Sequence, residues 1–368
     1  MSTIIADYKL DISFIPEDGD IQWDVVDGSA TIEDGQGTAK ISVKTDSEET
    51  ETFTLSCTVT KADGQSTVYT KEFTHERVTF DSTQVDPFGR DRDGILYRFE
   101  DDLIPIKTGW FEDSGYSGEL TPTDGEEYYE CAQGQKAIQC GNTKAYYCDR
   151  IASADNWNSS YVIHSYIFSI DDVAQSDGKE LYIAGVVKQT EYNNSNCNII
   201  GAANVFIKDR KLYFTGTITL HNGTATVYSS LTPSDVQTAP QGNINLYDYN
   251  LLASSEELQD NTIYHITIFT SRDDDKVYCY VNGELKSYIT FIHNDPDGYI
   301  TTGFSTTGSY YYSSVVGGYN LDGDGSEGDE VIISPIKVKN LRLLGYDDIV
   351  IYKEEAELMY LEAEGCEL

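Results

Sequence analysis

One acidic, glycine-rich stretch contains the residues best suited to hold an ion. Its candidate ligands all have oxygen-bearing side chains and are Asn320, Asp322, Asp324, Asp329 and Glu330. The first three alternate along the chain and a glycine follows each aspartate, which matches the first half of a calcium-binding loop. The twelfth position of such a loop normally supplies a bidentate glutamate, but here it is Val331, so Asp329 or Glu330 would close the site. The stretch therefore predicts either a calcium (Ca2+) site or a solvated acidic loop.

Tyrosines gather around the start of this stretch. They are Tyr310, Tyr311, Tyr312 and Tyr319. The ring of an exposed tyrosine stacks on the apolar face of a sugar, and a nearby cation holds sugar hydroxyls, so these residues are candidates for a ligand-binding surface. Tyrosine also packs well within a β-sheet, and strand packing explains the same residues. The sequence leaves both a glycan-binding platform and a set of structural tyrosines open.

The charge of the chain narrows the classes of partner. Asp and Glu number 62 while Lys and Arg number 25, which gives a formal net charge of −37 at pH 7. Nucleic-acid binding depends on Lys and Arg that displace counterions from phosphates, so nucleic acid is excluded as a partner. An anionic membrane surface is disfavoured for the same reason, while solubility and cation binding are favoured.

Cysteine spacing and hydropathy bear on where the chain folds. The seven cysteines are scattered without CxxC spacing, which disfavours zinc and predicts reduced thiols, while a bridge between Cys131 and Cys140 stays open. The first residues lack the basic and apolar segments of a secretory signal. No apolar run approaches the ~18 residues of a membrane-spanning helix, so no membrane insertion is expected. We expect synthesis and assembly in a cytoplasm.

Two β-rich domains are predicted from the elements along the chain. Residues 1–77 contain alternating apolar and polar segments such as Tyr8–Phe14 and Phe53–Val59, separated by Asp-Gly turns, as is typical of a β-sandwich. Residues 78–94 are polar with scattered glycine and proline, which predicts a linker. Residues 95–368 form the second domain, with longer strands. Its clearest strand candidates are Tyr161–Ile170, Glu180–Lys188, Asn204–Thr215, Ile263–Thr270, Lys276–Val281 and Ile336–Leu344.

In the first domain, Trp23 and Cys57 lie on different predicted strands. They resemble the buried tryptophan and one of the two core cysteines of an immunoglobulin-like domain. The stretch Val25–Gly35 is similar to the immunoglobulin-like modules of bacterial surface and phage proteins. Because the second core cysteine is missing, a domain of this kind would depend on its apolar core alone. The resemblance implies an immunoglobulin-like β-sandwich over residues 1–77.

In the second domain the most informative stretch is a pair of strands with their turns. Tyr264–Ile268 and Lys276–Val281 flank a charged turn, and the next two residues, Asn-Gly, supply the positive φ angles of a type I′ hairpin. The stretch resembles the hairpin of laminin G-like and pentraxin-like members of the concanavalin A-like superfamily. Tyr97–Glu100 and Ile336–Tyr352 are similar to the opening and closing strands. The resemblance implies an all-β chain whose C-terminal part, residues 95–368, is a concanavalin A-like jelly roll.

No set of residues matches a catalytic site. Enzymes of this superfamily that cleave β-glucans carry E-x-D-x-x-E or E-x-D-x-E on one strand, with the two working carboxylates about 5.5 Å apart. In the nearest stretch, Glu327–Glu330, the last carboxylate comes at an odd offset and points to the other face of a strand. None of the five histidines belongs to an H-E-x-x-H motif, and His265 is expected to be a structural imidazole. We expect a protein that is not an enzyme.

An immunoglobulin-like module joined to a lectin-like jelly roll normally acts outside cells, yet this sequence shows no export signal. A virion protein of a tailed phage resolves the conflict, because it is assembled in the host cytoplasm and acts outside after lysis. The layout resembles head fibres, capsid decorations and tail appendages. This implies docking to other virion proteins and homo-oligomerisation through the N-terminal domain, with display of a glycan-binding jelly roll. A bacterial cell-surface carbohydrate-binding protein is the alternative, and a glycan-cleaving enzyme is a weaker one.

Overall fold

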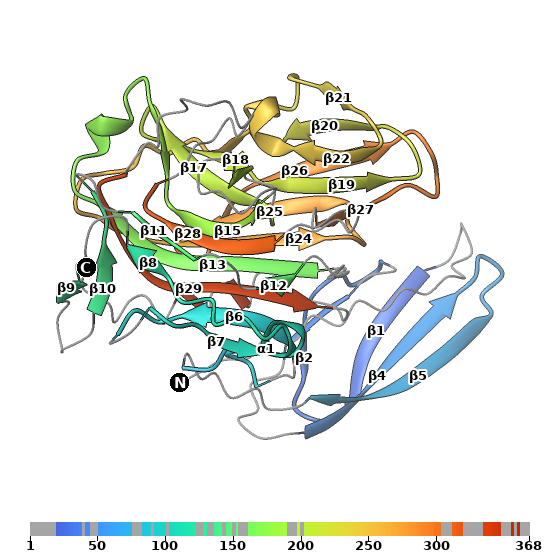
Figure 1. Cartoon of the computed structure of the whole chain (residues 1–368). Coiled ribbons are helices and arrows are strands. Elements are labelled where there is room, and N and C mark those ends of the chain that lie inside the picture. Colours follow the sequence, from blue (N-terminus) through green and yellow to red (C-terminus); the bar gives the residue numbers. More distant parts are fainter. Residues whose placement is uncertain are drawn as a thin grey trace. The chain divides into compact units, whose positions relative to one another are not determined.

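The computed structural model divides the chain into two compact units, Met1–Phe80 and Asp81–Leu368 (Figure 1). It describes residues 20–38, 41–44, 51–75, 83–89, 92–100, 103–122, 128–130, 136–141, 145–148, 152–153, 161–189, 197–198, 202–302, 311–318, 334–346, 355–356 and 359–360. Both units are built almost entirely of antiparallel strands, so the predicted all-β class is confirmed. None of the helices in these residues is long and apolar enough to cross a membrane.

The first unit contains a three-stranded antiparallel sheet, in the order β1-β4-β5, and a two-stranded ribbon of β2 and β3. Trp23 and Cys57 lie directly opposite each other on β1 and β4, and both are buried. The Trp23 indole donates a hydrogen bond of 2.9 Å to the Thr38 carbonyl, and the Cys57 thiol is free. The unit therefore has its own apolar core. Its strands are β1 (Asp20–Asp27), β2 (Thr31–Asp34), β3 (Ser42–Lys44), β4 (Glu51–Thr60) and β5 (Ser66–His75).

The second unit is a β-sandwich whose first layer is one large sheet of 11 strands. Its main path is β21-β20-β26-β25-β24-β13-β29-β10-β9, and β6 pairs with β29 and β7. These strands are β6 (Asp93–Tyr97), β7 (Ile106–Thr108), β9 (Tyr128–Glu130), β10 (Lys136–Gln139), β13 (Tyr161–Ile170), β20 (Ala225–Ser229), β21 (Gln237–Ala239), β24 (Ile263–Ser271), β25 (Lys276–Val281), β26 (Glu284–His293) and β29 (Ile336–Tyr346).

The second layer is made of three smaller antiparallel sheets. Their orders are β16-β15-β28-β11-β8 with β12 beside β28, then β14-β17-β18-β23, and β22-β19-β27. The strands are β8 (Thr121–Pro122), β11 (Tyr146–Tyr147), β12 (Ala152–Ser153), β14 (Glu180–Tyr182), β15 (Ala184–Gln189), β16 (Cys197–Asn198), β17 (Asn204–Lys208), β18 (Lys211–Thr215), β19 (Thr217–His221), β22 (Gly242–Asn245), β23 (Leu252–Ser254), β27 (Tyr299–Thr302) and β28 (Tyr311–Val316). Short helical turns are α1 (Trp110–Asp113), η2 (Val173–Ser176) and η3 (Leu246–Tyr249).

The core of the second unit lies between the layers, and strand alternation decides which side chains enter it. On the central strand β13, Tyr166 and Phe168 belong to this core, whereas Ile167 faces the opposite side of the large sheet and packs near Tyr360. The large sheet is thus covered on both faces around β13. This explains why β13 reads as an almost continuous apolar run, with every residue from 162 to 170 buried.

Two sequence expectations about elements have different outcomes in the structure. The hairpin after β25 is confirmed, since Asn282 and Gly283 have φ angles of 52° and 74° and Val281 pairs with Glu284. The division of the chain, by contrast, falls after Phe80, so most of the expected linker belongs to the second unit. Val85 and Phe88, which lie in that stretch, are buried.

The segment before β6 is held by buried charges. Arg92 lies 3.2 Å from Glu355 and 3.2 Å from Asp86, and all three side chains are 4 % exposed. The buried guanidinium of Arg342 on β29 donates to the Val85 carbonyl at 3.0 Å. These contacts join Val85 to β29 and Arg92 to Glu355 near the C-terminus. Residues that looked like a polar linker are therefore part of the folded unit.

Candidate functional site

The residues that the sequence offered as ligands are mostly outside what the structure describes. Asn320, Asp322, Asp324, Asp329 and Glu330 all lie there, as do Tyr310 and Tyr319. The backbones of Tyr311 and Tyr312 lie in β28, opposite Gln189 and Lys188 of β15, but their side chains are not described. Among the described residues, no group of three or more His, Cys, Asp or Glu is placed to hold a metal ion. Calcium binding and the tyrosine platform stay predictions.

A different group of side chains comes together on the sheet β22-β19-β27. Its inner face belongs to the core through Ile218, Leu220, Ile244 and Ile300. Successive side chains of a strand point to opposite faces, so the residues between these face away from the core. They are Thr219, His221, Asn243, Tyr299 and Thr301. We call them the outer-face cluster.

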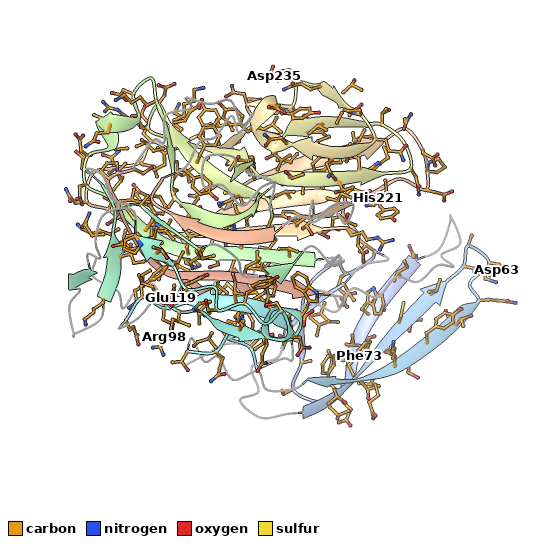
Figure 2. All side chains as sticks on the ribbon, viewed as in Figure 1. Asp63, Phe73, Arg98, Glu119, His221 and Asp235 are labelled. Carbon is orange, nitrogen blue, oxygen red and sulfur yellow. The ribbon has the colours of Figure 1, made fainter. Side chains whose placement is uncertain are left out.

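Hydrogen bonds and ring stacking fix the outer-face cluster. His221 pairs with Tyr299 across β19 and β27, and the two rings stack with centroids 4.5 Å apart and planes 10° from parallel. The Nε2 atom of His221 lies 2.8 Å from the hydroxyl of Thr301. On the other side of β19, Thr219 donates to the Asn243 side-chain oxygen at 2.7 Å. Because both rings and Thr219 are only half-buried, ring edges and polar atoms remain accessible. Figure 2 labels His221 at the end of β19.

Arg272, in the turn between β24 and β25, completes the site. Its guanidinium carbon lies 4.0 Å from the centroid of the Tyr299 ring, close enough for a cation–π interaction. Arg272 is exposed, and within the described part of the chain its guanidinium makes no hydrogen bond or ion pair. Three aspartates follow it directly in the sequence. An arginine fixed by stacking but with its N–H groups unused is ready to donate to a ligand.

The aspartates beside Arg272 have other partners. Asp275 accepts from the backbone N–H of Ile300 at 3.0 Å and lies 3.2 Å from Nε2 of His293. Asp274 accepts hydrogen bonds from the hydroxyls of Ser271 and Tyr278. These carboxylates therefore hold the turn in place, and none of the contacts points to a free acid or base.

Electrostatics keep the His221 ring neutral at neutral pH. Burial lowers the pKa of His221, and the neighbouring Arg272 and His293 lower it further. A neutral imidazole carries one donor and one acceptor nitrogen, and because Nε2 is paired with Thr301, Nδ1 is the nitrogen that a ligand hydroxyl would meet. Arg272 is therefore the cation of the site, while the ring contributes stacking area and neutral hydrogen bonds.

Two other histidines have no access to a ligand. His164 and His265 are 1 % and 3 % exposed. The ring of His164 meets that of Tyr166 inside the core, and Nε2 of His265 lies 3.0 Å from the Ser165 hydroxyl on the far face of the sheet. Burial lowers their pKa values to about 4 and about 3, respectively. The structural role expected for His265 agrees with this placement.

The sequence reasoning missed the outer-face cluster. In the sequence, His221 belongs to no motif, and Arg272 is one of four charged residues in a turn. One local signal was present: Thr217–His221 alternates Thr-Ile-Thr-Leu-His, which predicts a strand with one apolar and one polar face. The pairing of His221 with Tyr299 depends on the register of β19 and β27, which no local pattern reveals.

No protein-family model matches the sequence, and no curated protein matches it. Solved structures with a similar fold include three that are each 10 % identical to this chain. A mutant sialidase of Trypanosoma rangeli with trans-sialidase activity is 10 % identical over 89 % of this chain, with a TM-score of 0.37. This chain spans 46 % of that sialidase.

Two further similar structures come from Bacteroides ovatus and Ruminococcus gnavus. A putative carbohydrate binding protein from Bacteroides ovatus is 10 % identical, covers 97 % of this chain and 79 % of its own length, and has a TM-score of 0.29. The CBM40 module of the Ruminococcus gnavus IT-sialidase is 10 % identical, covers 64 % of this chain and 98 % of its own, and has a TM-score of 0.30. Likenesses this remote say nothing about the ligand of this chain.

Proposed function

We propose that the second unit is a glycan-binding module whose contact surface is the outer-face cluster together with Arg272. The observation that carries this is the stacked group of His221, Tyr299 and Arg272, which is held rigidly by the protein while the guanidinium N–H groups have no partner among the described residues.

Sugars present the chemistry that such a group fits. A sugar ring has apolar C–H faces and a rim of hydroxyls, each of which donates and accepts hydrogen bonds. Rings supply area for the apolar faces, and the neutral imidazole, the Thr219–Asn243 pair and the guanidinium supply donors and acceptors for the rim. Because these side chains sit on paired strands and are fixed by mutual contacts, little entropy is lost when a ligand orders them.

Binding of the full-length chain to a glycan array tests the proposal, with calcium and with chelator as separate arms. Tyr299→Ala removes the ring that both His221 and Arg272 contact, so we expect at least a tenfold loss of affinity for any glycan that the wild type binds, about 1.4 kcal/mol. Tyr228→Ala is the matched control, because Tyr228 is a half-buried tyrosine on the outward side of β20 in the other layer. Equal losses for both variants, or no glycan bound by the wild type, would refute the proposal.

We also propose that the chain acts by binding and not by catalysis, as a virion protein of a tailed phage that docks through its first unit and displays the second. The engaged carboxylates beside Arg272 and the net charge of −37 support a soluble display role. Release of reducing sugar from any glycan that binds would contradict the non-enzymatic part. The genes flanking this one distinguish the two settings, since capsid and portal genes favour a virion and glycan-uptake genes favour the bacterial surface alternative.

A further inference from the structure

The outer-face cluster lies at one end of a longer row of outward-facing residues. Strand β18 runs through the single residue Gly216 into β19 (Figure 1). In this run the even-numbered side chains belong to the core, namely Leu212, Phe214, Ile218 and Leu220. The alternation passes through Gly216 without a change of phase, so the odd-numbered side chains share the outer face. They are Lys211, Tyr213, Thr215, Thr217, Thr219 and His221.

A second aromatic group occupies the other end of this row. Tyr213 stacks on Phe206 of β17 with ring centroids 5.7 Å apart, and the Tyr247 ring of η3 lies 5.5 Å from Phe206. The Tyr247 hydroxyl donates to Glu180 at 2.7 Å, and Lys208 pairs with the same carboxylate. Phe206 is fully buried while Tyr213 and Tyr247 are half-exposed. The group is therefore a second fixed aromatic platform on the same outer face.

The span between the two platforms is set by the backbone. His221 comes eight positions after Tyr213 in the sequence. An extended strand of this length spans at most about 26 Å between the two Cα atoms. Gly216 has a φ of 93°, and a Cβ atom there would clash with the Ala202 carbonyl oxygen, so only glycine fits at this joint. Thr215 and Thr217, in the middle of the row, are buried, so other atoms of the protein cover the row there. A ligand that reaches both ends therefore passes over this covered stretch and contacts the exposed rings at the two platforms.

We propose that both platforms bind one saccharide chain, so that the ligand is an oligosaccharide or polysaccharide long enough to reach from the Tyr299 platform to the Tyr213 platform. The inference rests on the proposed function and specifies its substrate class. Once one end of a chain is bound, the other end is held at a high local concentration near the second platform, so affinity rises steeply when the chain becomes long enough to reach it.

The test is a length series of one repeating saccharide, from dimer to decamer, measured with the full-length protein. The series are cello-, laminari- and chito-oligosaccharides, each as free ligands in calorimetry. We expect weak binding of the short members and a rise of at least tenfold in affinity once the chain spans the row. Tyr213→Ala is expected to remove that rise and leave the affinity for short members unchanged, while Tyr213→Phe keeps it because the ring is retained.

The outcomes separate the two proposals. If short and long members bind with equal affinity and Tyr299→Ala abolishes both, the glycan-binding function stands and the extended ligand is refuted. If Tyr213→Ala weakens short and long members equally, the two platforms are not separate subsites, and this inference also fails. If no member of any series binds, the proposed function itself fails in this form. Thermal unfolding of each variant identifies a loss of binding that reflects a loss of fold.

Discussion

At the residue scale, the site combines one permanent cation with a neutral ring. An arginine guanidinium is always charged in proteins, whereas burial and the neighbouring Arg272 and His293 lower the pKa of His221. Protonation of His221 would add a second positive charge beside Arg272, which the same interactions disfavour. The chemistry of the site is therefore constant around neutral pH, and hydrogen-bonding toward uncharged hydroxyls does not depend on a titration.

The histidine inside the core gives the fold a predictable response to acid. Burial lowers the pKa of His164 to about 4 from an ordinary value of 6.5, so the unfolded chain binds a proton that the folded chain refuses. The stabilisation is fully present above pH 6.5 and is lost as the pH falls toward 4, by about 3 kcal/mol for this group. Urea unfolding at several pH values between 7 and 4 measures the loss.

A variant isolates the contribution of His164 from the other acid-sensitive groups. His164→Leu keeps a side chain of the core but removes the ionisable ring, so its unfolding free energy should fall less steeply between pH 6.5 and 4 than that of the wild type. His265 is also buried and neutral, and it titrates in both proteins, so a residual slope is expected. Parallel slopes for the two proteins would show that His164 does not couple to folding.

The candidate site illustrates what single residues in a sequence reveal. Asp322 and Asp324 attract attention because an oxygen-rich motif is local, but their side chains lie outside the described residues. Tyr299 and His221 belong to no motif, because the stack forms only through the register of two strands far apart in the chain. Sequence patterns identify functional side chains that are neighbours in the sequence. They miss side chains that a β-sheet brings together from distant parts of the chain.

At the scale of elements, the buried ion pair between Arg92 and Glu355 holds the C-terminal segment on the large sheet. Breaking a buried ion pair costs about 3–5 kcal/mol when the remaining charge has no other partner, and less here, because Arg92 keeps Asp86 at 3.2 Å. We expect Glu355→Gln to lower the unfolding free energy by about 1–3 kcal/mol, measured by urea denaturation at neutral pH. Asp177→Asn is the control, since it breaks an exposed pair with Arg210 and should change stability little. Equal effects from both variants would contradict a special role for the buried pair.

Strands could be predicted from the sequence where alternation or apolar runs are long. The expected strands Tyr161–Ile170 and Lys276–Val281 are confirmed with the same bounds as β13 and β25. The stretch before β6 reads as a linker because most of its residues are polar. In the structure Val85 and Phe88 are buried, and the Val85 carbonyl accepts a hydrogen bond from Arg342, which lies 257 positions later in the chain. The local sequence does not reveal contacts between residues this far apart in the chain.

At the scale of the whole molecule, each unit has a core of its own. The first unit packs around Trp23 and Cys57, and the second around the space between its two layers. Separate cores let one unit serve attachment while the other serves recognition, which is the division of labour proposed for a displayed virion protein. The strong negative charge keeps copies of the chain apart in solution unless a specific contact joins them.

The place of β29 in the large sheet has a consequence for biosynthesis. β29 pairs with both β13 and β6. Among the described strands of the second unit, β6 comes first in the sequence and β29 comes last. During translation, β6 leaves the ribosome roughly ten seconds or more before the strand that it must pair with. Until then β13 has one unpaired edge and an exposed apolar surface, and the second unit cannot complete its large sheet before β29 is synthesised. A nascent chain with such an exposed edge is of the kind that holding chaperones bind.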